Sequence, residues 1–83
     1  MTQHWLNCEI TKGMFSDEVT IVIRAHDGEK VAAFVPKDRV DGHVEAMGRV
    51  KVRVFENVGR RFAVLPNESQ TVVDVDDSQL AVA

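Results

Sequence analysis

Apolar and polar residues alternate along most of this chain, and the alternation predicts six short β-strands. The expected strands are residues 4–11, 18–25, 30–35, 49–56, 60–65 and 71–76. Residues 36–48 break the pattern, and only there do we expect helix, as two single turns over 36–40 and 41–47 with Gly48 as the stop. Short strands joined by tight turns predict an all-β fold with at most one short helix. We expect a small antiparallel barrel of five to six strands, OB-like or SH3-like.

The turn at residues 26–29 allows two registers for the hairpin around it. A two-residue loop pairs Ile21 with Phe34, whereas a three-residue loop sets Arg24 opposite Lys30. Like charges directly opposite each other are unfavourable, so the two-residue loop is predicted. In that register a second apolar face is formed by Val22, Val31, Ala33 and Val35.

The hairpin of residues 49–65 turns at 57–59. A three-residue loop with Gly59 in the left-handed position pairs Val54 with Phe62 and keeps apolar residues on one face. A four-residue loop mixes the two faces. We therefore predict the three-residue loop.

Length and composition indicate one globular domain over residues 1–83. Hydrophobic residues make up 45% of the chain and charged residues 28%. Cys8 is the only cysteine, so no disulfide within the chain can support this small core, and a reducing compartment is indicated. No signal peptide is recognisable, and the longest apolar run, residues 31–35, is too short for a membrane span. A cytoplasmic location without membrane association is therefore predicted.

A basic hairpin is the first candidate binding surface. Residues 49–61 hold five basic residues and one acidic residue, a local charge of +4. Basic side chains with an aromatic among them can hold the backbone and bases of a single-stranded nucleic acid. The candidate residues for this function are Arg49, Lys51, Arg53, Phe55 and Arg61.

The acidic C-terminal segment offers a competing explanation for the basic hairpin. Residues 66–83 hold four acidic residues and no basic ones, a local charge of −4, and a meander places them beside the hairpin. The whole chain has ten basic and thirteen acidic residues, a net charge of −3, with a pI near 5.5. This balance favours mutual neutralisation within the sheet over nucleic-acid binding.

A two-sided apolar hairpin is the second candidate surface. A barrel covers one face of each strand, so the other face of residues 19–35 needs a cover of its own. We predict a protein interface, to a partner or to a second copy, formed by Trp5, Val22, Val31, Ala33 and Val35. The helical turn and the apolar tail, residues 80–83, could instead cover this face within one subunit.

Metal sites and catalysis are not indicated. His4 and Cys8 share a strand face, but at about 3.3 Å per residue they stand too far apart for one metal ion. The acidic run at residues 74–78 lacks the glycine and the final ligand of a calcium loop. Ser16 beside Asp17 has no nucleophile-elbow context, and no nucleophile, base and oxyanion donor can be named together. We expect a non-enzymatic interaction module with no cofactor, with nucleic-acid binding or service as an enzyme's accessory domain as the alternatives.

Overall fold

The computed structural model describes residues 2–83 as an almost entirely β protein, as predicted. Its strands and 3-10 turns are β1 (Thr2–Lys12), β2 (Glu18–Arg24), β3 (Lys30–Pro36), η1 (Lys37–Arg39), β4 (Val40–Asp41), β5 (Ala46–Asn57), β6 (Arg60–Val64), β7 (Val72–Val75), η2 (Asp77–Gln79) and β8 (Leu80–Val82). No helix within this part of the chain is long and apolar enough to cross a lipid bilayer.

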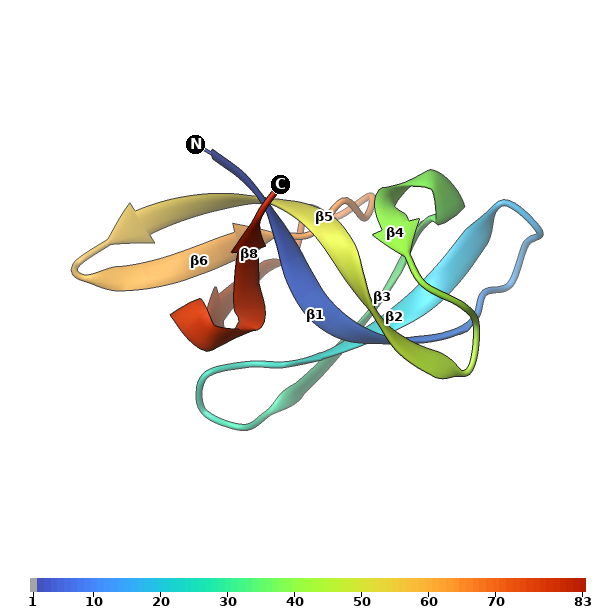
Figure 1. Cartoon of the computed structure of the whole chain (residues 1–83), viewed down its shortest axis with the longest axis horizontal. Coiled ribbons are helices and arrows are strands. Elements are labelled where there is room, and N and C mark those ends of the chain that lie inside the picture. Colours follow the sequence, from blue (N-terminus) through green and yellow to red (C-terminus); the bar gives the residue numbers. More distant parts are fainter. Residues whose placement is uncertain (1) are drawn as a thin grey trace.

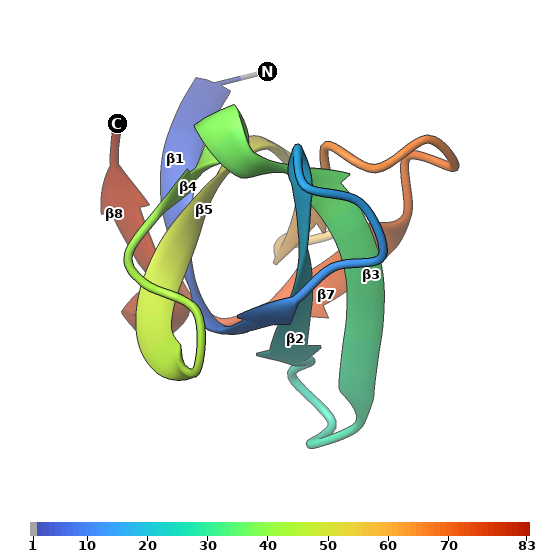
Figure 2. The same cartoon turned by 90° about the vertical axis from the view of Figure 1, so that its right-hand side faces the viewer.

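The strands form a nearly closed antiparallel barrel, in the order β3-β2-β1-β5-β6-β7. β1, β2 and β3 form a meander, and β5 returns to lie beside β1, which is the Greek-key arrangement (Figure 1). Seen from the side in Figure 2, the main strands surround a common centre. Because β1 is long and bent, it pairs with β5 along most of its length, with β2 at one end and with β8 near the other.

Contacts from the β2–β3 turn to β7 and η2 link the two ends of the sheet. The His26 backbone N–H donates to the Asp74 carbonyl oxygen at 2.8 Å, and the side chains of His26 and Asp76 are hydrogen-bonded at 2.5 Å. The Gln79 amide donates to the Arg24 carbonyl oxygen at 2.6 Å. These bonds close one end of the barrel without a continuous strand ladder.

The core consists of the inward residues of six strands and of Leu65, which follows β6. It contains Leu6, Cys8, Ile10, Val19, Ile21, Ile23, Ala33, Val35, Val50, Val52, Val54, Ala63, Leu65, Val73 and Val75. Alternation along β1, β2, β5 and β7 predicted the inward face of each correctly. Burial raises the pKa of the Cys8 thiol to about 11, since the barrel interior disfavours a thiolate.

The predicted register of the β2–β3 hairpin is wrong. Ile21 pairs with Ala33, and Arg24 does lie opposite Lys30. The charge conflict is relieved because the Arg24 guanidinium turns away and donates to the Gly28 carbonyl oxygen at 2.9 Å. Gly28, with φ of 89°, takes the left-handed position of the longer loop.

The predicted register of the β5–β6 hairpin is also wrong. Val54 pairs with Ala63, and Phe55 pairs with Phe62 on the outer face. The loop has only two residues, Val58 and Gly59, with φ of 52° and 74°, which are the two positive values of a type I′ turn. A β-branched residue rarely adopts this conformation, so a two-residue loop with Val58 in it was not predicted.

The segment between β3 and β5 forms one helical turn rather than two. η1 follows Pro36 as predicted, but residues 41–47 form a short strand pair and a turn. Gly48, expected to stop a helix, lies inside β5, where a Cβ would stand 2.5 Å from the Ile10 side chain and 2.6 Å from the Asp41 carbonyl oxygen. The apolar tail pairs as β8 with β1, not with β2 or β3.

Candidate interaction surfaces

The apolar face predicted for the β2–β3 hairpin does not exist as a surface. With the observed register, Ala33 and Val35 point into the core and are 8% and 1% exposed. Val31 packs against the core, and Val22 is half-buried. Of the predicted interface residues, Trp5 alone lies elsewhere, on the outer face of β1 between β5 and β8. The hairpin therefore has one core face, not two apolar faces in need of cover.

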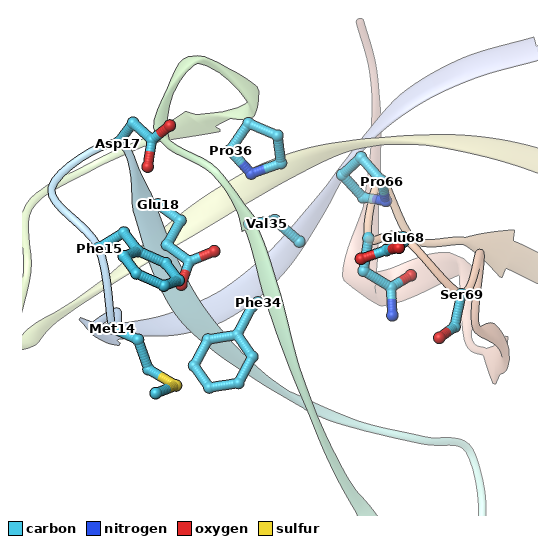
Figure 3. A pocket seen from close by; sticks show the side chains of 11 residues that line it. Met14, Phe15, Asp17, Glu18, Phe34, Val35, Pro36, Pro66, Glu68 and Ser69 are labelled. Carbon is cyan, nitrogen blue, oxygen red and sulfur yellow. The ribbon is translucent and has the colours of Figure 1, made fainter.

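A different apolar cluster is exposed at one end of the barrel. Met14, Phe15 and Phe34 are 73%, 68% and 48% exposed. They line one side of a hollow of about 640 Å³, and Pro66 and residues 67–69 line the other (Figure 3). The observed register places Phe34 on the outer face of β3. One feature of the sequence could have indicated this cluster. Met14 and Phe15 are two large apolar residues in a predicted loop, outside any alternating pattern that would bury them.

The β1–β2 loop that presents Met14 and Phe15 is held by backbone contacts. A Cβ at Gly13 would lie 2.5 Å from the Glu18 carbonyl oxygen, so glycine permits this tight path. The Glu18 N–H donates to the Phe15 carbonyl oxygen at 3.3 Å. The Lys37 N–H donates to the Asp17 carbonyl oxygen at 3.0 Å and ties the loop to η1. The exposed apolar side chains thus stand on an anchored loop.

The facing loop, between β6 and β7, is held by an asparagine. The Asn67 side chain donates to the Thr71 hydroxyl at 2.8 Å and accepts from the Thr71 backbone N–H at 2.9 Å. The Leu65 N–H donates to the Thr71 carbonyl oxygen at 2.9 Å and closes the base of the loop. Both walls of the hollow are therefore fixed before any ligand binds.

The hollow is acidic, and we call it the acidic hollow. Its lining includes three carboxylates, those of Asp17, Glu18 and Glu68, and among the described residues it includes no lysine, arginine or histidine. No ion pair of residues 2–83 involves these carboxylates. The site combines exposed aromatic surface with unneutralised negative charge.

An open strand edge borders the acidic hollow. β3 ends the sheet and pairs only with β2 in the part of the chain that the structure describes. Its last residues, Phe34, Val35 and Pro36, line the hollow. Unpaired backbone groups on such an edge can accept an added strand, although Pro36 has no N–H to donate.

Four residues of the predicted set, Arg49, Lys51, Arg53 and Phe55, lie on the outer face of β5, together with Trp5 of β1. Arg61 does not share this face, because it lies on β6 opposite Glu56. Arg49 and Lys51 lie over the Trp5 ring, with Arg49 Cζ 4.6 Å and Lys51 Nζ 5.5 Å from its centroid. Further along, Phe55 stacks on Phe62 with ring centroids 5.4 Å apart. The sequence assigned Trp5 to a different surface, and β1–β5 pairing brings it here.

Acidic residues of the C-terminal segment form ion pairs with part of the basic hairpin of residues 49–61, as the charge balance indicated. Arg60 binds Asp74 through two hydrogen bonds of 2.7 and 3.3 Å, and this contact raises the pKa of Arg60. Arg61 lies 3.2 Å from Asp77.

Arg49 forms an ion pair with an acidic residue outside the C-terminal segment, because Asp41 of β4 lies 3.0 Å away. Among residues 2–83, Lys51 and Arg53 form no ion pair. The unneutralised charge of the predicted basic set is thus concentrated on these two residues of β5.

Metal-binding geometry is not found in residues 2–83, where no group of three His, Cys, Asp or Glu side chains could hold an ion. His4 and Cys8 share the inner face of β1, as expected, and His4 contacts Thr2 at 3.2 Å.

Comparison of the chain with protein-family models, with curated proteins and with solved structures finds no match.

Proposed function

We propose that this protein is a non-enzymatic interaction module whose acidic hollow binds an extended segment of a protein partner. The segment would carry apolar side chains between lysines or arginines. The observation that supports this is the lining, in which three exposed large apolar residues stand with three unpaired carboxylates and no cation. Exposed apolar patches of this kind mark partner surfaces.

Each part of the hollow has a counterpart in such a segment. Met14, Phe15 and Phe34 would contact its apolar side chains, and burial of that surface would supply most of the affinity. The carboxylates would select lysine or arginine and reject acidic sequences. The free edge of β3 would pair with the segment's backbone and orient it.

The experiment is an amide NMR titration with a short blocked peptide in which Lys alternates with Leu and Phe. We expect shifts confined to residues 13–18, 34–37 and 66–71, with a dissociation constant on the order of 100 µM. The same peptide with Glu in place of Lys should give no shifts. No shifts in these segments with the basic peptide would refute the proposal.

Matched variants separate the two contributions. Phe15→Ser should weaken peptide binding about tenfold, whereas Met47→Ser, at a side chain 69% exposed outside the hollow, should not. Glu18→Gln with Glu68→Gln should weaken binding about fivefold, whereas Glu9→Gln with Glu29→Gln should not. Shifts that grow with protein concentration in the absence of peptide would instead identify the occupant as a second copy.

The strand order supports one of the two predicted barrel types. We infer an OB-like barrel, because β5 returns beside β1 in a Greek key and the OB-fold is a five-stranded Greek-key barrel. Fold alone carries no function, so the proposal above does not depend on this assignment.

A further inference from the structure

A second hollow, of about 400 Å³, lies where the strand ladder along β5 is broken. β4 pairs with β5 at Val50 and Arg49, and β6 pairs with it from Arg53 onward. Lys51 and Val52 therefore have no ladder partner on this edge. The hollow occupies this break, between η1 and the β6–β7 loop.

The lining of this second hollow is cationic, and we call it the cationic hollow. It brings together three positive side chains from two distant segments, Arg39 of η1 with Lys51 and Arg53 of β5. No carboxylate lines it, and none of the three cations forms an ion pair within residues 2–83. Neutral hydrogen-bonding groups complete it, namely the side-chain amides of Gln3, Asn67 and Gln70.

This donor set fits a phosphate group. Guanidinium groups present paired N–H donors that match phosphate oxygens, and a lysine adds a third positive charge. Amide N–H groups can donate to oxygens that the cations leave free. The absence of carboxylates from the lining removes the repulsion that would exclude an anion.

Aromatic surface continues from the cationic hollow along the same sheet face. Lys51 lies between the hollow and the Trp5 ring, since it lines the one and contacts the other. Arg53 is followed on the same face of β5 by Phe55. A chain of phosphates with attached bases could therefore extend from the hollow over aromatic side chains, which a free anion would not contact.

We propose that the cationic hollow binds a backbone phosphate of a single-stranded nucleic acid, a function separate from peptide binding at the acidic hollow. Arg39, Lys51 and Arg53 hold the phosphate, and Trp5 and Phe55 contact the neighbouring nucleotides. Three cations predict a salt dependence of log Kobs on log[salt] with a slope of about −2. Arg61, which belonged to the sequence-based set, is already paired with Asp77 and contributes little.

The experiment titrates the full chain with an oligodeoxythymidylate of about ten nucleotides, and separately with inorganic phosphate. Trp5, the single tryptophan, reports through its fluorescence, and amide NMR identifies the site. We expect the oligonucleotide to change Trp5 emission and to shift residues 36–40, 49–55 and 64–70. Inorganic phosphate alone should shift the amide resonances of residues that line the hollow without changing Trp5 emission.

Variants that each remove one positive charge distinguish binding at the cationic hollow from non-specific electrostatic attraction of the oligonucleotide. Arg39→Gln and Arg53→Gln should each weaken oligonucleotide binding about fivefold and reduce the salt slope by about 0.7. Lys12→Gln makes the same change in net charge at a residue outside the hollow and should have no effect, and Arg61→Gln should have little.

Three outcomes would overturn the proposal. One is absence of binding at low salt, and another is an equal loss for Lys12→Gln and Arg53→Gln. Equal affinity for phosphate and oligonucleotide would limit the site to a free anion. The two hollows share Pro36, Pro66 and Asn67 but no charged residue, so the charge-removal variants test the two proposals separately.

Discussion

The acidic and cationic hollows lie on either side of a common wall and carry opposite charge. Pro36, Pro66 and Asn67 line both of them. One has three carboxylates and no cation, and the other has three cations and no carboxylate. The net charge of the whole chain, −3, does not indicate the local charge of either hollow. For a domain this small, the local grouping of charges is the better guide to ligands.

Both hollows arise where strand pairing stops. The acidic hollow borders the free edge of β3, and the cationic hollow fills the break between β4 and β6 along β5. At such breaks outward side chains from non-neighbouring segments can converge without a ladder between them. The difference between the two proposed ligands follows from which charges these segments carry.

The largest effect is expected from inverting the charge of one hollow. Lys51→Glu with Arg53→Glu should reduce oligonucleotide affinity at least about a hundredfold at low salt, because repulsion replaces attraction. Binding of the basic peptide at the acidic hollow should be retained. Both affinities can be measured by NMR titration, and loss of peptide binding in a folded variant would show that the hollows are not independent in charge.

A smaller effect on both sites is expected from Asn67→Ala. This change removes two hydrogen bonds to Thr71 that hold the common wall, so stability should fall by about 1–2 kcal/mol. Both ligands should bind more weakly, because each hollow loses the same wall. Urea denaturation and the two titrations measure these losses, and a loss confined to one ligand would contradict a shared wall.

The smallest effect is expected from Val58→Asn, outside both hollows. Asparagine tolerates the left-handed conformation that Val58 adopts, so the β5–β6 turn should gain about 1 kcal/mol. Neither ligand affinity should change, which would separate binding from overall stability. A stabilised variant with altered oligonucleotide affinity would mean that the hairpin's rigidity contributes to the cationic hollow.

Strands with one apolar face were predictable from sequence, and strands with two were not. β1, β2, β5 and β7 each place a single alternating set inward, so their faces were correct. In β3 and β6 apolar residues occupy both faces, and a shift of one residue exchanges them. Phe34 and Phe62 were therefore assigned inward, but both lie on the outer face.

The two turns that set those registers depend on details that a pattern does not contain. The Arg24 guanidinium avoids repulsion from Lys30 by donating to a backbone carbonyl oxygen, and Val58 adopts a left-handed conformation. Each is a local exception to a general preference, and tertiary packing outweighs its cost. Sequence rules of this kind rank alternatives but do not decide between registers of similar energy.

The candidate sites were predictable only where their residues are neighbours in sequence. Lys51 and Arg53 were named from the basic hairpin. Arg39 was not, because it lies twelve residues before Lys51 and meets it only through the path of η1 and β4. When residues distant in sequence are brought together by the fold, the sequence contains no characteristic spacing that would identify them.

Cys8, enclosed among the strands, is a natural chemical probe of barrel opening. A thiol reagent reaches this sulfur only while the barrel is open, because the side chain is 2% exposed and its thiolate is disfavoured. The rate of thiol labelling therefore reports how often the barrel opens. A ligand that binds the closed barrel slows labelling, and each tenfold slowing corresponds to about 1.4 kcal/mol of added stability of the closed barrel at that ligand concentration.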